Sequence, residues 1–538
     1  MGEQRSRTGC SNCKRLGIKC DEKKPRCTKC IKSNLEHCNY KIKLKWRHYP
    51  KNENMIPSTA IQKSSTLRLL AYPRSDGVAP LTGNNTAAEG QVPILSEENT
   101  FHCETRIGLQ LCAPEFLTTP SIVPIAADCM ELLEFFKQEA SLLFIVAPER
   151  SFQKSPFFNL IPSMALHNDM VMNAVLAFSA AWKNNRYLDR RDDPIIEEKG
   201  KEVGKFWNTT VSLLHQKLST DYRLEKVEIM VTMLLLAAYD LCFFDAPIKW
   251  RAHIRAVRDL LSPIQNYSDP AYKHDFFFFK KSILFISSWL SYIEIMSSLC
   301  SPKHSPSAQN LIKLANQLKY SYSIKTMEDK RLRCEDIENT TGMDPIILSF
   351  LAKIAALIKK LSHVPSEFTL KNLQDGIELD EELAVYIDES EKARDQVLST
   401  SIDAGINTSA YRILRATNLV FALTGRALLK KRVFDFEPRR YSLVKIIMRI
   451  MHLIESEVCL NSSAESCIFF PLFCCGCELI SSDLLMFRSM VLNHLDSLIN
   501  RGISSAVHAK LIMKECWMSE KPWWLLLEES GIDLVFNI

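Results

Sequence analysis

The chain has 538 residues, of which 46% are hydrophobic and 24% are charged, and its formal net charge is +5. No residue class is extreme, so the chain has ample apolar material for a large core. Glycine is scarce, at 16 residues, which argues against glycine-rich phosphate loops and turn-dense β folds and favours long helices.

The charge is distributed unevenly along the chain. Residues 1–50 contain fourteen Lys or Arg and four Asp or Glu, a balance of +10, so the remainder carries −5. A basic head on a mildly acidic body is the asymmetry expected of a nucleic-acid binder with a separate domain that does not bind nucleic acid.

Six cysteines lie within this basic head, with the spacing Cys10-x2-Cys13-x6-Cys20-x6-Cys27-x2-Cys30-x7-Cys38. Zn²⁺ binds thiolates in tetrahedral geometry, so six thiolates either fill one site with two left over or fill two sites that share two bridging sulfurs. The second solution uses every cysteine. The opening residues MGEQRSRTGC lack the apolar stretch of a secretory signal, so we expect thiols rather than disulfides.

A short basic arm and a linker follow the cysteines. Residues 41–47 alternate basic and apolar side chains, which predicts an extended arm with one basic face, including Lys41 and Lys43. The next stretch is rich in Pro, Ser, Thr, Asn and Gly, which predicts a flexible linker. We therefore divide the chain into a DNA-binding domain with its arm at 1–47, a linker at 48–124 and a helical domain at 125–538.

Apolar residues at helical spacing predict that the third region is entirely α-helical. The predicted helices are Met130–Val146, Leu160–Trp182, Val203–Leu218, Val227–Phe244, Trp250–Leu261, Phe276–Leu299, Pro345–Leu361, Tyr411–Lys431, Leu443–Val458, Leu484–Ile499 and Ala506–Trp517. Residues 320–342 and 362–405 are more polar, which predicts loops or surface helices. We expect no membrane partner, because the longest apolar stretch, Ile229–Phe244, contains Asp240 and falls short of the about 20 residues that span a bilayer.

The sequence RTGCSNCKRLGIKCDEKKPRCTKCIKSNLEHC resembles the fungal Zn2Cys6 binuclear-cluster transcription factors over about 35 residues. The six spacings, Lys14, Lys19, the Cys20-Asp21 pair and Pro25 all fit that family. The resemblance implies two Zn²⁺ per chain, both bridged by Cys10 and Cys27, with Cys13 and Cys20 completing one site and Cys30 and Cys38 completing the other.

The resemblance also implies sequence-specific binding of double-stranded DNA at CGG-type half-sites, through the short helix after the second cysteine. That family often has a basic residue where this chain has Gly17. We expect Gly17 to end the helix, so that backbone carbonyls accept from a cytosine amino group. The remaining contacts are expected from donors at Lys14, Arg15 and Lys19, and from phosphate-binding side chains at Lys23, Lys24, Arg26, Lys29 and Lys32.

An alternative interpretation is a zinc-stabilised protein-interaction module that does not read DNA. Members of the resembled family commonly dimerise through a coiled coil after the cluster, yet residues 40–75 show no sustained heptad of apolar positions. Either the helical domain carries a homodimer contact, or the protein binds single half-sites.

The helical region resembles the regulatory domain that accompanies the cluster in these factors. The resemblance rests on Phe469–Glu478 (FFPLFCCGCE), on Trp517 and on Trp250–His253 (WRAH). Together these motifs look like the subtype found in yeast regulators of nitrogen-compound and lysine metabolism. The resemblance implies a nuclear regulator of RNA polymerase II genes that contacts the transcription machinery or coregulators, with a small-molecule effector as a further hypothesis. Because Cys474, Cys475 and Cys477 lie on an apolar helix, we expect them in the core. No Walker, GxGxxG, HExxH or GxSxG motif is present, so we expect no enzymatic activity.

Overall fold

The computed structural model describes residues 12–13, 20–21, 23, 26–33, 126–148, 155–186, 194–219, 225–243, 249–262, 276–301, 305–328, 336–363, 370–403, 405, 407–434 and 440–534. These residues form helices and turns but no β-strand, which confirms the mainly α fold class. The predicted linker, 48–124, lies outside them, as does the basic arm.

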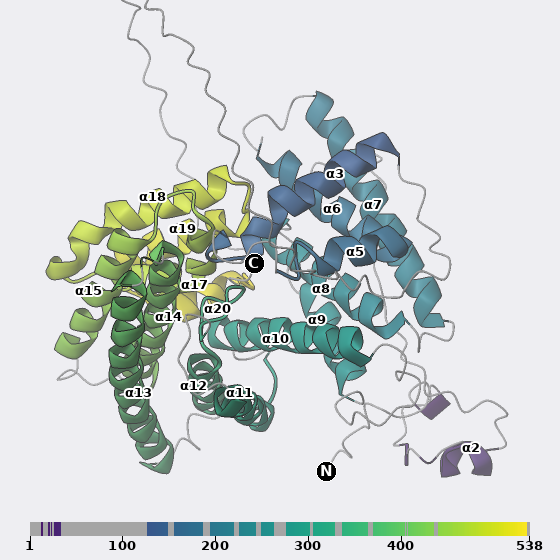
Figure 1. Ribbon diagram of the computed structural model, residues 1–538. Coiled ribbons are helices and arrows are strands. Elements are labelled where there is room, and N and C mark those ends of the chain that lie inside the picture. The colour runs from purple at the N-terminus through teal and green to yellow at the C-terminus, as the bar shows by residue number, and fades with distance from the viewer. Residues whose placement is uncertain are drawn as a thin grey trace, which may run out of the picture. The chain divides into compact units, whose positions relative to one another are not determined.

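Most described helices belong to the large domain (Figure 1). In chain order they are α3 (Ala127–Gln138), η1 (Ala140–Phe144), α5 (Leu160–His167), α6 (Asp169–Asn185), α7 (Pro194–Ser219), α8 (Lys226–Phe243), α9 (Lys249–Leu261), α10 (Phe276–Cys300), α11 (Ala308–Glu328), α12 (Pro345–His363), α13 (Leu370–Asp403), α14 (Ser409–Leu428), η8 (Leu429–Val433), α15 (Arg440–Glu457), α16 (Ser463–Cys467), α17 (Phe469–Gly476), η10 (Ser482–Phe487), α18 (Arg488–Asn500), α19 (Ser505–Ser519) and α20 (Trp523–Ser530).

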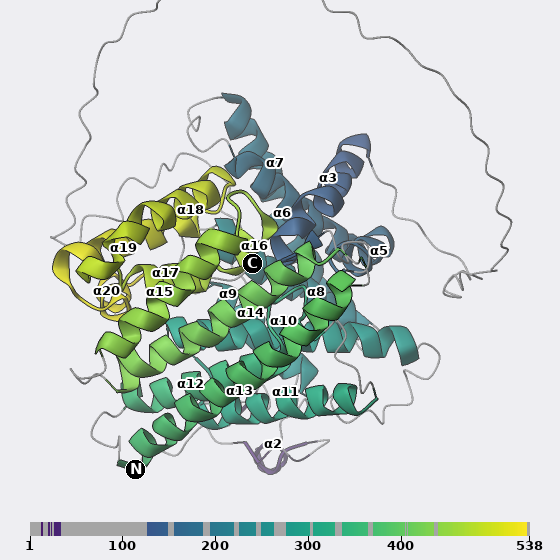
Figure 2. The ribbon, with the colours of Figure 1, turned by 60° about the vertical axis from the view of Figure 1, so that its left-hand side comes forward.

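The helices share one continuous apolar core. In the first half, α6 packs against α3, α5, α7 and α8, and α8 packs against α9. In the second half, α14 contacts α12, α13, α15 and α17, and Figure 2 shows α13, α14 and α15 running side by side. Helix α17 is buried along its whole length, because its side chains are almost all apolar and other helices surround it.

The predicted helix at Leu160–Trp182 is two helices in the structure. Asn168 separates α5 from α6, and its side-chain oxygen accepts from the backbone N–H groups of Met170 and Val171 at 3.1 and 3.2 Å. This cap satisfies the first free donors of α6, so the chain begins a new helix instead of continuing the old one.

Helix α13, a single 34-residue helix, occupies most of the polar region 362–405. Its buried residues include Gly376, Leu379, Leu383 and Ile387, which recur every three to four positions and face the domain. The structure also adds α20, which the sequence analysis did not predict. This short helix follows Pro522 and ends at Gly531, whose φ of 65° is a left-handed helix stop.

One described helix segment, Phe279–Cys300 of α10, is long and apolar enough to span a membrane by length and composition. However, 78% of its most apolar window is buried inside the domain, where α10 packs against α8, α9 and α12. Packing within the protein therefore accounts for its apolar character.

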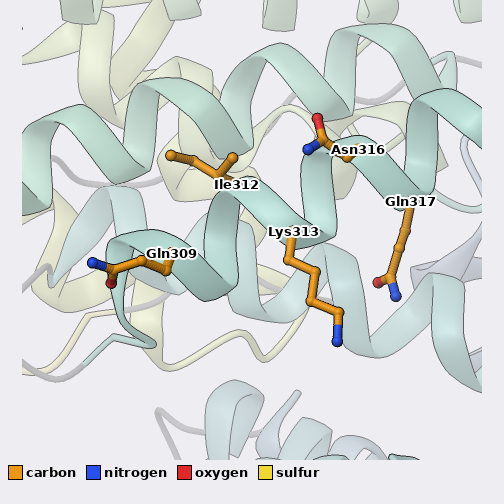
Figure 3. Close-up of a pocket in the computed structure, with 5 residues that line it drawn as sticks. All are labelled: Gln309, Ile312, Lys313, Asn316 and Gln317. Atoms are coloured by element: carbon orange, nitrogen blue, oxygen red, sulfur yellow. The ribbon is translucent and has the colours of Figure 1, made fainter.

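The domain surface has a hollow along α11, shown in Figure 3, with a volume of about 560 Å³. Its described lining comes from one helix only and consists of Gln309, Ile312, Lys313, Asn316 and Gln317. The hollow is open and a single helix lines it, so it has the character of a helix face and not of an enclosed ligand site.

Candidate metal centre

Four of the six clustered cysteines are described, and all four are buried. Cys13, Cys20, Cys27 and Cys30 expose at most 5% of their surface. Together they form a core of their own, separate from the large apolar core. Among the described residues of this small module, the buried core consists of cysteines alone, which is typical of a metal site.

Three of these cysteines converge on one point. The sulfur atoms of Cys13, Cys20 and Cys27 all lie within 4.8 Å of one another, and those of Cys13 and Cys27 are 3.6 Å apart. Zn–S bonds of about 2.3 Å at tetrahedral angles would place neighbouring sulfurs about 3.8 Å apart, whereas a disulfide requires about 2.05 Å. The donor set therefore fits a tetrahedral zinc site with one ligand still to be supplied.

The two remaining predicted ligands, Cys10 and Cys38, lie outside the described residues. Cys10 is the predicted fourth ligand of the site that contains Cys13, Cys20 and Cys27. Cys30 lies next to Cys27, since its backbone N–H donates to the Cys27 sulfur at 3.3 Å. Zinc held by these thiolates would cross-link the module and stabilise its fold.

A short helix, α2 (Thr28–Lys32), begins directly after Cys27 and positions Cys27 and Cys30. Cys27 is its N-cap residue, and the N–H groups at the start of the helix are satisfied by the Cys27 sulfur and by Asp21.

Asp21 and Asn12 are supporting residues whose contacts the sequence analysis did not predict. Asp21 accepts from the Thr28 backbone N–H at 3.0 Å and also from the Thr28 hydroxyl. The Thr28 side-chain hydrogen bond is the main cause that lowers the pKa of Asp21. Asn12 donates to the Cys30 sulfur at 3.7 Å. These contacts join the segments beside Cys13 and Cys20 to the segment after Cys27.

Four of the predicted DNA-contacting residues are described, namely Lys23, Arg26, Lys29 and Lys32, and they follow Cys20 in the chain. Lys23 and Lys29 are exposed and Arg26 is half-buried. Lys29 lies in the last turn of α2 together with Lys32, where a cation is favoured by the helix dipole. The other predicted contacts lie outside the described residues: Lys14, Arg15, Gly17, Lys19, Lys24, Lys41 and Lys43.

The cysteines of α17 do not form a second site among the described residues. Cys474, Cys475 and Cys477 are all buried, and Cys13, Cys20 and Cys27 make up the one group of three metal-binding side chains found in the described part of the chain. Hydrogen bonding to Cys475 and burial raise the pKa of Cys474 well above its usual range, so this thiol stays neutral and packs as a small apolar group.

Comparison with known proteins matches two separate parts of the chain. Residues 8–47 match the fungal Zn(2)-Cys(6) binuclear cluster domain, and residues 131–536 match the fungal specific transcription factor domain. Arginine metabolism regulation protein II of Saccharomyces cerevisiae is 46% identical over 46 residues, which cover 9% of this chain and 5% of that protein. An uncharacterized transcriptional regulatory protein of Schizosaccharomyces pombe is 36% identical over 79 residues, or 15% of this chain and 13% of that protein.

The matched segments thus span only a small part of either relative, and no solved structure matches the chain. The transcription factor domain alone covers well over half of the chain, and the cluster domain covers the converging cysteines. The chain therefore belongs to the fungal Zn(2)-Cys(6) transcription factors that carry the fungal specific transcription factor domain.

Proposed function

We propose that this transcription regulator is nuclear, acts on RNA polymerase II genes, and binds CGG-type half-sites in double-stranded DNA through a cluster that holds two Zn²⁺. The observation that carries the proposal is the convergence of the Cys13, Cys20 and Cys27 sulfurs in a module whose described Lys23 and Lys29 are exposed. Six thiolates and two Zn²⁺ sum to −2, so nearby Lys and Arg offset the cluster charge as well as attract phosphate.

In this proposal the chain has three parts. Residues 1–47 bind DNA, and their zinc ligands are Cys10, Cys13, Cys20, Cys27, Cys30 and Cys38. Residues 48–124 connect this domain to residues 125–538, which regulate transcription. The proposed partners of the third part are coregulators or the transcription machinery, a second copy of the chain, and a small-molecule effector.

The zinc part of the proposal is tested by metal content and DNA binding of the full chain. We expect about two zinc ions per chain, and Cys27→Ala should abolish DNA binding because a bridging sulfur serves both sites. Cys459→Ala is the matched control, since Cys459 is an exposed free cysteine of the helical domain. Tight, specific DNA binding by zinc-free protein would contradict the proposal.

The DNA part is tested by selecting sequences from a random pool with the full chain. Enrichment of a CGG-type motif supports the proposal. Lys23→Ala and Lys29→Ala should each reduce the slope of log affinity against log salt by about 1, because each phosphate contact releases about one counterion. Lys392→Ala, which removes an exposed lysine from α13, should leave the slope unchanged.

A protein-interaction role of the cluster is the second candidate. Ile31 of α2 exposes 57% of its surface between Lys29 and Lys32, and an exposed apolar side chain is more typical of a protein contact than of a phosphate contact. Failure of the zinc-loaded chain to enrich any DNA sequence would favour this function.

A further inference from the structure

Large apolar side chains are exposed in a row on helix α19. Val507, Leu511 and Met518 expose 37%, 56% and 74% of their surface. These positions and Lys514 follow a spacing of four, three and four residues, so they form one stripe about 60° wide along the helix. The opposite face, with Ala509, Ile512, Met513 and Cys516, is buried in the domain.

The stripe has apolar neighbours at the same edge of the domain. Leu525 of α20 and Leu485 and Met486 of η10 expose 44%, 44% and 69%. Helix α19 packs against α18 and α20, and the Arg488 guanidinium, which directly follows η10, stacks on Trp517 of α19 at 4.5 Å. Figure 2 shows α18, α19 and α20 together along the outside of the domain. A monomeric protein rarely leaves such a patch open to solvent.

We propose that this stripe binds the same stripe of a second copy, with the two α19 helices antiparallel across a two-fold axis. This contact would be the interface of the homodimer that the proposed function includes, so the inference rests on that part of the proposed function. In heptad terms, Leu511 and Met518 occupy a positions, and Val507 and Lys514 occupy d positions. A two-fold between residues 512 and 513 places Val507 opposite Met518 and Leu511 opposite Lys514, on both sides of the axis.

The charges beside the stripe favour this antiparallel pairing of identical copies. His508 and Glu515 lie on the same flank, and the two-fold brings His508 of one copy beside Glu515 of the other, twice. Lys514 and Glu515 are half-buried and make no ion pair with any residue that the structure describes, so their charges are available to a partner. A parallel pair would instead set Lys514 against Lys514 in the centre of the stripe, which is unfavourable.

Lys514 at a d position fixes the register of this pairing. Its aliphatic stem covers Leu511 of the second copy while its ammonium group reaches solvent at the edge of the stripe. A polar residue at one core position of a helix pair selects register and orientation at some expense of affinity. Because residues 40–75 contain no heptads, the α19 stripe gives this chain a route to a dimer without a coiled coil after the cluster.

The test is sedimentation of the full chain over a range of concentrations, without DNA. The wild-type chain should form a dimer, and Leu511→Glu should weaken the dimer at least about tenfold by placing a charge in the stripe. Val385→Glu is the matched control, because Val385 is exposed to 57% on α13, almost as Leu511 is on α19. Circular dichroism checks that each variant keeps its helix content.

Substitutions that exchange charges at positions 508 and 515 distinguish the proposed contact from a non-specific effect of adding a charge to the surface. His508→Glu alone places Glu beside Glu515 of the second copy and should weaken the dimer, whereas the double variant H508E/E515K should restore it. A wild-type chain that sediments as a monomer at every concentration, an L511E variant that dimerises as well as wild type, or a double variant without restoration overturns the proposal.

Binding to a single half-site separates this inference from the proposed DNA function. L511E should bind one half-site as wild type does, because the cluster is unchanged. Wild-type dimers that bind no DNA would contradict the DNA function and leave the α19 contact supported.

Discussion

Arg394 and Asp344 form an ion pair inside the helical domain, with 2.6 Å between Nη2 and Oδ2. Both side chains are almost completely buried. The other Asp344 oxygen accepts from the backbone N–H of Ile347 at 2.8 Å, so Asp344 caps α12 while Arg394 holds it from α13. Burial opposes the charge on Asp344, so its pKa is raised although Arg394 lowers it. One carboxylate therefore starts one helix and joins it to another.

We predict that Arg394→Met lowers the free energy of unfolding by about 3–5 kcal/mol, because it leaves buried carboxylates without their cation. Arg394 also pairs with Asp336 at 2.8 Å and with Glu391 at 3.1 Å, so more than one acid loses its partner. Urea unfolding measures the effect. Lys392→Met is the control: its pair with Asp388 is exposed and should contribute less than about 1 kcal/mol. Equal losses in the two variants would contradict the role assigned to Arg394.

Asp380 of α13 should make the domain sensitive to acid. Burial raises the pKa of Asp380, but hydrogen bonds and charges from Arg426 and Lys430 outweigh it, and the pKa lies below its ordinary value of 3.8. Since the folded-state pKa is the lower one, this stabilisation is complete above the unfolded-state pKa and is lost as the pH falls through the folded-state pKa.

Asp380→Asn should therefore lower stability by about 1–3 kcal/mol at neutral pH, and the difference from wild type should shrink as the pH falls below about 4. Thermal unfolding across pH 3–7, a range set by the about 3.9 pKa of a free Asp, measures it. Asp388→Asn removes an exposed acid and serves as control. A difference between D380N and wild type that stays constant with pH would rule out the ion pairs as its cause.

The sequence predicted the helices whose apolar residues recur regularly, including those that became α8, α9, α12 and α15. It did not predict α13 as one helix, because its buried Arg394 is compensated by Asp336 and Asp344, which lie far away in the sequence. From the local sequence pattern alone, an arginine such as Arg394 is predicted to be exposed. The sequence does contain a signal for the helix break at Asn168, since Asn before Asp is a favoured helix start. The apolar pattern continues on both sides of Asn168, however, and predicted a single helix.

The cysteine spacing likewise predicted a metal module, because metal ligands must recur at spacings that allow chelation. The roles of Asp21 and Asn12 depend on which segments of the module meet in space, and cysteine spacing alone does not determine those contacts. An Asp seven residues before a helix-starting Thr is too general a signal to have revealed the Asp21–Thr28 contact.

Gly476 should be intolerant of any side chain. A Cβ there would lie 2.6 Å from Met513 Cε and 3.0 Å from Val491 Cγ1, where α17 meets α18 and α19. Trp517 also donates to the Gly476 carbonyl at 2.9 Å, so the backbone has little room to retreat. We predict that Gly476→Ala destabilises the domain by about 1–3 kcal/mol.

The control for this prediction is Gly200→Ala in helix α7. A Cβ there meets only Asn184 Nδ2, at 3.9 Å, so the change should be neutral or stabilise by about 0.5–1 kcal/mol, as expected within a helix. Shifts of unfolding midpoint in opposite directions for the two variants are the expected result. A G476A variant with an unchanged unfolding midpoint would show that the side chains around Gly476 can move apart to accommodate a methyl group.

Asp21→Ala should accelerate zinc loss without removing a zinc ligand. Asp21 satisfies the Thr28 backbone N–H and so holds the start of α2, where Cys27 serves both as helix cap and as predicted bridging ligand. Residues that orient metal ligands commonly contribute about 10–100-fold to metal affinity. We therefore expect zinc transfer to a coloured chelator to be at least about tenfold faster in D21A than in wild type. Lys23→Ala, two residues away and exposed, should transfer zinc at the wild-type rate. If D21A and K23A lose zinc equally slowly, the Asp21–Thr28 contact is dispensable and the six thiolates alone determine the stability of the cluster.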